Sequence, residues 1–147
     1  MLKLTISPGL ISYSEATRYT PKKYEETKVW CKANDKPIPK HLLYPRTKGF
    51  ITTVQHLRKS THIKAVYDIT IAYSRKNKFL EAPTIWETLS LPDLTNKQKF
   101  NFHVYVRRFP LEDLPHEDVG LAQWLENRWI EKGEWLEGKR DEWSRGI

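Results

Sequence analysis

The stretch Ala65-Val-Tyr-Asp-Ile-Thr-Ile-Ala-Tyr73 has the strongest strand signal in the sequence. It is rich in β-branched and aromatic residues, which favour extended backbone. Because its apolar side chains fall on both faces, we predict a strand that is buried on both faces or nearly so. Asp68 interrupts the apolar run, and its carboxylate needs a structural partner such as a backbone amide or a basic side chain.

A second strand is predicted further along the chain at Phe100-Asn-Phe-His-Val-Tyr-Val-Arg-Arg108. Its strict alternation is typical of a half-buried strand. The apolar face would consist of Phe100, Phe102, Val104 and Val106. The connection from Ser74 to Lys99 contains two prolines and no sustained periodicity, so we expect a loop there.

Three helical segments surround these strands. Thr20 and Pro21 form a helix start, with Thr20 as N-cap and Pro21 at the first helical position, and this helix runs to about Ala33. Apolar residues at three- and four-residue spacing predict an amphipathic helix from Thr47 to Lys59. One or two further helices are expected from about Glu117 to Trp143.

The last of these segments carries four of the six tryptophans. Tryptophan is frequent at membrane interfaces, but the segment from Leu111 to Ile147 has five basic and ten acidic residues, a poor match for anionic lipid. We therefore expect Trp124 and Trp129 to pack in the core.

Two shorter stretches complete the element order. Leu10–Tyr13 is predicted to be the end of a strand, and His41–Tyr44 to be a short strand that stops at Pro45. Alternation of strands and helices predicts an α/β layered sheet with crossover helices, followed by a mostly helical C-terminal segment. With about four strands at most, the sheet has the character of one part of a larger domain.

Composition limits the alternatives. A chain of 147 residues suits one domain, and the single cysteine, Cys31, excludes an internal disulfide or a multi-cysteine zinc site and fits a reducing, cytosol-facing environment. No run of about 18 apolar residues occurs, so no transmembrane segment is expected in this chain. The net charge of +7 favours an anionic partner. Its basic part lies in residues 18–64, with 12 basic and three acidic residues.

Common catalytic motifs are missing from the sequence. It contains no nucleophile elbow, phosphate-binding loop, dinucleotide fingerprint or zinc-protease motif. None of the five histidines has an aspartate five residues later, so no His-x-x-x-x-Asp pair is present to act as a general base. We predict neither a catalytic residue nor a metal ligand within this chain.

The turn Glu15-Ala-Thr-Arg18 is the first candidate binding site. It places a carboxylate, a hydroxyl and a guanidinium after a predicted strand, where open α/β sheets bind ligands. The planar fork of Arg18 matches two phosphate oxygens, and Glu15 could hold that fork or bind a ligand hydroxyl. The alternative is a solvated turn with a surface ion pair. Arg46 and Lys48, at the start of a predicted helix, are second candidates for anion contact.

Several blocks of the sequence resemble one enzyme family. Ser12-Tyr-Ser-Glu-Ala-Thr-Arg-Tyr-Thr-Pro-Lys-Lys23 resembles the Pro-Glu-Gly-Thr-Arg block of the 1-acylglycerol-3-phosphate O-acyltransferases. His41-Leu-Leu-Tyr-Pro-Arg-Thr-Lys-Gly-Phe50 resembles the signature of the branch that includes lysophosphatidic acid and lysocardiolipin acyltransferases. Later blocks at 66–73, 102–110, 114–115 and 125–132 follow in the family's order and reach its C-terminal acyltransferase-associated region.

The resemblance implies the C-terminal part of a glycerolipid acyltransferase. Residues 1–73 would be the C-terminal part of the acyltransferase domain, and residues 74–147 the acyltransferase C-terminal region. The implied reaction moves an acyl group from acyl-CoA to 1-acylglycerol 3-phosphate or a related lysophospholipid in phospholipid biosynthesis or remodelling. The implied location is an endomembrane surface, that of the endoplasmic reticulum facing the cytosol. Acyl-CoA would be a co-substrate, with no further cofactor, and Glu15, Thr17 and Arg18 would hold the acceptor's glycerol phosphate.

The chain departs from the family pattern in two ways. Ala16 stands where the family has glycine, and its Cβ would be unfavourable if the turn needs a positive φ. The family's His-x-x-x-x-Asp block precedes the block at 12–23 and has no counterpart here, so we expect this chain alone to be an inactive fragment.

Two other functions stay open on the sequence. One is a non-catalytic phospholipid-binding remnant that uses the same Arg18 chemistry. The other is a basic nucleic-acid-binding module built on residues 18–64, although no RNA- or DNA-binding signature is present and no nucleic-acid partner is expected.

Overall fold

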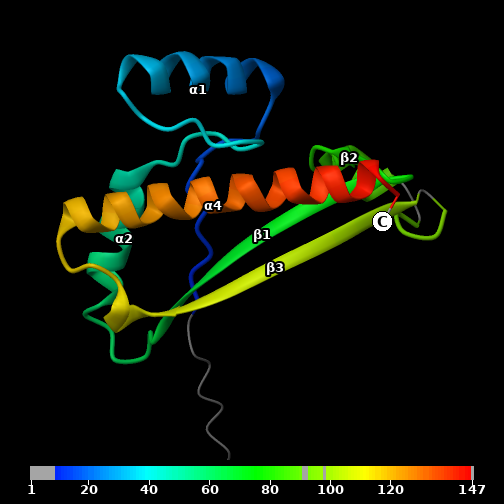
Figure 1. The fold of residues 1–147 in the computed structure, drawn as a ribbon. Coiled ribbons are helices and arrows are strands. Elements are labelled where there is room, and N and C mark those ends of the chain that lie inside the picture. The colour runs from blue at the N-terminus through cyan, green and yellow to red at the C-terminus, as the bar shows by residue number, and fades with distance from the viewer. Residues whose placement is uncertain (1–8, 91–92, 98, 147) are drawn as a thin grey trace, which may run out of the picture.

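The computed structural model describes residues 9–90, 93–97 and 99–146. In chain order its elements are α1 (Pro21–Ala33), α2 (Thr47–Leu57), β1 (Ala65–Arg75), β2 (Lys78–Leu80), α3 (Ile85–Ser90), β3 (Phe100–Pro110), a 3-10 turn η1 (Leu111–Asp113) and α4 (Asp118–Ser144) (Figure 1). The three long predicted helices and the two long predicted strands are confirmed, and the last helical segment is one continuous helix. Thr20 caps α1 as expected, because its hydroxyl accepts a hydrogen bond from the Lys23 amide at 3.3 Å.

The sheet has the order β2-β1-β3, and both pairings are antiparallel. The coarse expectation of helices packed on a sheet is confirmed, but the predicted crossover arrangement is not found in the described part of the chain. The chain turns back directly after β1 at Lys76 and Asn77, whose positive φ values of 51° and 62° are typical of a tight hairpin. After β2 the described residues form the short helix α3, and β3 then runs antiparallel to β1. The expectation of a loop from Ser74 to Lys99 is therefore wrong at β2 and α3.

The two short predicted strands are wrong. Leu10–Tyr13 is irregular and leads into a turn in which the Ala16 amide donates to the Tyr13 carbonyl at 2.9 Å. His41–Tyr44 begins with a residue at φ 61°, a left-handed conformation that does not continue a strand.

The prediction that β1 is buried on both faces is also wrong. One face of the sheet is covered by α4 and buries Thr70, Ala72 and Ser74. On the other face the register pairs Ile69 with Val106 and Ile71 with Val104, and these side chains are exposed. Four residues were predicted to form the apolar face of β3. Phe102, Val104 and Val106 are exposed because they lie on this uncovered face, and only Phe100 is buried. We call the exposed surface the apolar sheet face and define it by Tyr67, Ile69, Ile71, Phe102, Val104 and Val106.

The main core lies where α2, η1 and α4 meet (Figure 1). Its buried members are Phe50, Val54, Leu111, Leu114, Leu121 and Leu125. Trp124 stacks on Phe50 with ring centroids 5.6 Å apart, and both Trp124 and Trp129 pack against this core as predicted. No helix in the described ranges combines the length and the apolar character that crossing a bilayer requires.

The loop after α1 is attached to α4 through a buried carboxylate. Glu126 accepts hydrogen bonds from the Lys36 ammonium at 2.8 and 3.1 Å and from the Tyr44 hydroxyl. Burial and the bond to Glu126 raise the pKa of Tyr44 well above its usual value of 10. This attachment fixes residues 36–44 over α4 and so positions the segment that approaches the candidate site.

Candidate functional site

The two sequence blocks singled out above lie side by side. The Arg46 amide donates to the Ser14 carbonyl at 2.6 Å, and the Leu43 backbone amide donates to the Glu15 carboxylate. Residues 13–18 and 41–50 therefore form one local structure although about 28 residues separate them. Ala16 adopts φ 55°, the left-handed conformation that glycine accepts most readily.

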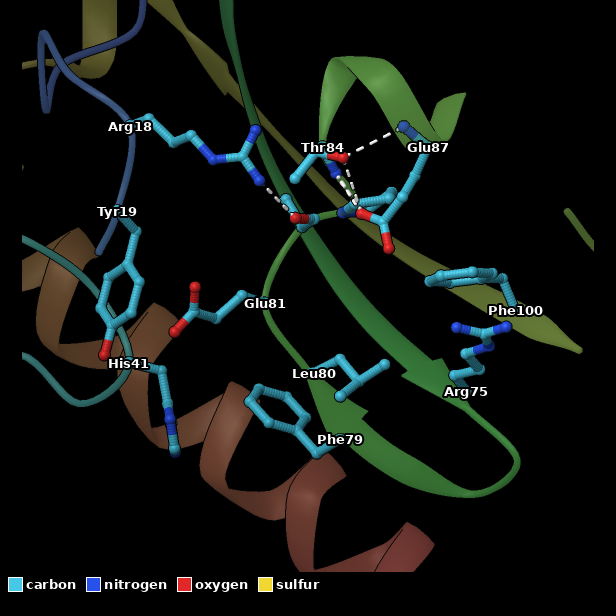
Figure 2. Close-up of a pocket in the computed structure, with 12 residues that line it drawn as sticks. Arg18, Tyr19, His41, Arg75, Phe79, Leu80, Glu81, Thr84, Glu87 and Phe100 are labelled. Atoms are coloured by element: carbon cyan, nitrogen blue, oxygen red, sulfur yellow. Dashed lines mark hydrogen bonds between the residues drawn. The ribbon is translucent and has the colours of Figure 1, made fainter. Parts of the chain in front are cut away.

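Arg18 extends from this structure to the rim of a pocket with a volume of about 640 Å³ (Figure 2). Its guanidinium donates from Nη2 to the Ala82 carbonyl at 2.7 Å. Arg75 enters the same pocket from the opposite side in this view, with its guanidinium 5.1 Å from the centre of the Phe100 ring. Two arginines from distant parts of the chain thus line one pocket.

The pocket also contains two carboxylates, Glu81 and Glu87. Glu87 is engaged in capping α3, because it accepts from the Thr84 amide at 2.7 Å and from the Thr84 hydroxyl at 2.8 Å while its own amide donates back to that hydroxyl. These bonds hold the pKa of Glu87 below its usual value, so the carboxylate is anionic at neutral pH. The local field in the pocket is therefore mixed rather than uniformly positive.

Thr17 precedes Arg18 in the turn. It does not line the pocket but contacts the first turn of α1. Its hydroxyl accepts a hydrogen bond from the Lys23 ammonium, which also donates to the Arg18 carbonyl at 3.4 Å. Lys23 thereby links the turn to the helix that follows it.

Arg46 and Lys48 are exposed at the start of α2. Arg46 occupies the N-cap position without a side-chain capping bond, and the first turn of the helix holds no acidic residue. Neither residue lines the pocket that Arg18 reaches. The structure therefore connects Arg46 to the turn through its backbone and leaves its side chain in solvent.

Glu15 points away from the pocket and toward α4. Its carboxylate accepts a hydrogen bond from the Trp129 indole N–H at 3.3 Å. Burial raises the pKa of Glu15 above its usual value, and the bonds from Trp129 and Leu43 and the charge of Lys132 oppose that rise. The sequence predicted only core packing for Trp129, not a contact with Glu15, and Lys132 was not singled out. The available signal was their three-residue spacing, which places both on one side of α4.

Lys132 belongs to a buried ionic cluster beneath the sheet. Its ammonium contacts the Asp68 carboxylate and donates to the Ile69 carbonyl at 2.8 Å. Arg107 donates to the same carboxylate from Nε at 3.2 Å and Nη2 at 2.7 Å. The expected structural partner of Asp68 is thus confirmed. Across the described ranges, no three histidine, cysteine or acidic side chains gather as a metal ion would require.

Comparison with known proteins identifies the family that the C-terminal part of the chain resembles. Residues 93–138 match the family described as the acyltransferase C-terminus.

The similarity to individual proteins is more extensive. The 1-acyl-sn-glycerol-3-phosphate acyltransferase delta of Homo sapiens is 41% identical over 120 residues, which cover 82% of this chain and 29% of the relative. The delta protein of Bos taurus is 39% identical over 133 residues, covering 90% and 31%, and the Homo sapiens gamma protein is 38% identical over 120 residues, covering 82% and 29%. The chain resembles the C-terminal region of the 1-acylglycerol-3-phosphate acyltransferase family, as the sequence blocks indicated. It spans 29 to 31% of the length of these relatives, and no solved structure matches it.

Proposed function

We propose that this chain supplies the acceptor-binding side of a lysophospholipid acyltransferase. The whole reaction would transfer an acyl group from acyl-CoA to 1-acylglycerol 3-phosphate or a related lysophospholipid. The names of the relatives support this reaction class, since they are 1-acyl-sn-glycerol-3-phosphate acyltransferases. A phosphate-bearing acceptor also agrees with the net charge of +7.

The observation that carries the proposal is the placement of Arg18 at the pocket. An arginine has five N–H donors, so the bond to the Ala82 carbonyl orients the guanidinium plane while other donors bind phosphate oxygens. Arg75 on the other side of the pocket would add a second positive charge near the same phosphate. The aromatic rings of Tyr19 and Phe79 offer apolar surface to the glycerol and the start of the acyl chain.

The other predicted residues have supporting roles in this proposal. The Thr17 hydroxyl accepts from Lys23, and its own proton would be donated to the acceptor's glycerol phosphate. Arg46 and Lys48 would attract the anionic headgroup from the start of α2, where the helix dipole also favours an anion. Glu15 would support the turn that carries Arg18.

The chemical step needs a base that removes the proton from the acceptor hydroxyl. These 147 residues contain no His-x-x-x-x-Asp pair. We therefore assign acceptor binding to this chain and expect it, by itself, to leave acyl-CoA unchanged.

A membrane surface is the second partner in the proposal. The apolar sheet face has arginine at both ends, with Arg75 at one end and Arg108 at the other, and the strand residues on this face include no carboxylate. An apolar surface with basic ends matches the interface of an anionic bilayer. The cytosol-facing surface of the endoplasmic reticulum is the proposed location.

Binding of a soluble acceptor by the 147-residue chain tests the proposal. The probe is lysophosphatidate with a six-carbon acyl chain, titrated by calorimetry and compared with the monoacylglycerol that lacks the phosphate. Arg18→Ala is expected to weaken lysophosphatidate binding by at least about tenfold, because a charge-assisted hydrogen bond contributes about 1.5 to 3 kcal/mol.

Arg145→Ala is the matched control, since it removes an exposed arginine outside both the pocket and the apolar sheet face and should change the affinity by less than about twofold. Equal binding by the parent chain and by Arg18→Ala would rule out the proposed role of Arg18.

A further inference from the structure

We propose that Trp129 of α4 acts as a positioning residue, with Lys132 packed against its ring: Trp129 holds Glu15, and through it the turn that presents Arg18 to a phosphate-bearing acceptor. This inference rests on the acceptor-binding role proposed above. It gives residues of the acyltransferase C-terminus match a part in the acceptor site, although neither of them lines the pocket.

Glu15 and Arg18 point in different directions from the turn. Three residues apart in one turn, they contact different parts of the molecule, with Glu15 bound to Trp129 and Arg18 bound to the Ala82 carbonyl. Glu15 is partly buried and Arg18 is exposed. A carboxylate that faces the protein interior is suited to fixing the backbone between the two residues, not to contacting a ligand at the pocket.

The backbone between Glu15 and Arg18 has an unfavourable conformation at Ala16. Ala16 has φ 55°, a left-handed conformation that is unfavourable for an L-residue with a Cβ. The turn itself provides one backbone hydrogen bond, from the Ala16 amide to the Tyr13 carbonyl. Bonds from outside must therefore maintain it, and they come from Arg46 to Ser14 and from Leu43 and Trp129 to Glu15.

Lys132 packs against the Trp129 ring that holds Glu15. Its ammonium is buried, lies 5.0 Å from the centre of the Trp129 ring, and contacts Asp68 and the Ile69 carbonyl. Asp68 and Arg107 fix the place of this ammonium beside the Trp129 ring. The Trp129 N–H and the Lys132 charge oppose the rise in the pKa of Glu15 that burial causes, and the bond from Trp129 requires only an oxygen acceptor at residue 15.

The experiment compares variants of the 147-residue chain in the binding assay described above. Glu15→Ala should weaken binding of the six-carbon lysophosphatidate by about tenfold, whereas Glu15→Gln should stay within about threefold of the parent, because an amide oxygen still accepts from Leu43 and Trp129. Trp129→Phe removes the indole donor and keeps an aromatic ring, although a smaller one, and should weaken binding by about threefold. Trp135→Phe is its control on the same helix, since Trp135 packs on His103 and Tyr105, and should have no effect.

Two further measurements distinguish a positioning role of Glu15 from a general loss of structure in the Glu15→Ala variant. Binding of the monoacylglycerol without phosphate should be the same in Glu15→Ala and the parent, because only the presentation of Arg18 has changed. The double variant Arg18→Ala/Glu15→Ala should bind no more weakly than Arg18→Ala alone.

The inference is overturned if the two substitutions weaken binding additively, if Glu15→Gln is as weak as Glu15→Ala, or if Trp129→Phe equals the parent. Failure of the proposed function gives a different result, since Arg18→Ala would then bind as the parent does.

Discussion

Gly133 is where the backbone of Lys40 crosses α4 most closely. A Cβ at this position would lie 2.7 Å from the Lys40 nitrogen and 2.9 Å from its carbonyl oxygen. Because both are backbone atoms, the loop itself would have to move. We expect Gly133→Ala to lower the free energy of unfolding by about 1 to 3 kcal/mol, measured by urea denaturation.

Gly138 is the matched control in the same helix, because a Cβ there meets nothing within 4 Å. Gly138→Ala should raise the free energy of unfolding by about 0.5 to 1 kcal/mol, since alanine is the better helix former. If both substitutions stabilise the protein, the loop does not lie against α4 as described.

Tyr44 provides a prediction about pH. Its hydroxyl donates to the buried carboxylate of Glu126, and its pKa is raised in the folded state. A group whose folded pKa is raised contributes its full stability below its unfolded pKa, here about 10, and loses that contribution as the pH rises further. Tyr44→Phe should therefore be less stable than the parent by about 1.5 to 3 kcal/mol at pH 7.

The difference between Tyr44→Phe and the parent should shrink as the pH rises above 10, when followed by urea denaturation at a series of pH values. A constant difference from pH 7 to pH 11 would contradict the raised pKa.

At the scale of elements, α4 holds the fold together through its apolar side. Leu121 is fully buried at 0% exposure in the core that α4 shares with α2 and η1. Leu121→Ala should lower the free energy of unfolding by about 2 to 5 kcal/mol, because it leaves a cavity in a packed core. Val119 is the control, because it lies two residues earlier on the same helix and is 82% exposed. Val119→Ala should have almost no effect on the free energy of unfolding.

The three long helices could be predicted because their signals are local. Thr20 and Pro21 mark the start of α1, and the spacing of Phe50 and Val54 marks the buried side of α2. The short elements β2 and α3, which lie where a loop was expected, were missed. The two long strands could be placed from local signals, but their burial could not. Whether Ile69 and Val106 are covered depends on which elements pack on each face of the sheet, and that information lies outside the strands themselves.

The candidate site shows the same division. Arg18 could be selected from its residue type and from the block at 12–23 that resembles the family's, and the positive φ of Ala16 could be anticipated from the family's glycine. The direction of Glu15 could not, because its partner Trp129 is 114 residues away in the sequence. Glu15 had two possible partners, the nearby Arg18 and the distant Trp129, and only the tertiary structure shows which of them it binds.

At the scale of the whole molecule, the apolar sheet face should mediate membrane contact. Ile69→Thr/Val106→Thr keeps β-branched residues in both strands while removing apolar surface. We expect the double variant to bind vesicles containing phosphatidylserine roughly tenfold more weakly than the parent, since each apolar group removed from the interface costs about 0.8 kcal/mol. Cosedimentation with vesicles measures this.

Val119→Thr is the control for that measurement, because it alters an exposed apolar residue outside the sheet. Equal binding by the double variant and the parent would exclude this face as the contact. So would a parent chain that forms dimers through it in sedimentation velocity experiments and ignores vesicles.

The contacts of α4 also determine when parts of the chain can fold during synthesis. Glu15 can contact Trp129, His41 can contact Glu137 and Lys36 can contact Glu126 only after α4 has been made. These pairs are 114, 96 and 90 residues apart. At ribosomal rates of about 5 to 20 residues per second, the turn at 13–18 exists for roughly 5 to 25 s before its partner on α4 has been made. Contacts between such distant residues also slow folding itself. The N-terminal half of this chain is therefore the part that a growing polypeptide leaves unprotected longest, and the part a chaperone would have most time to bind.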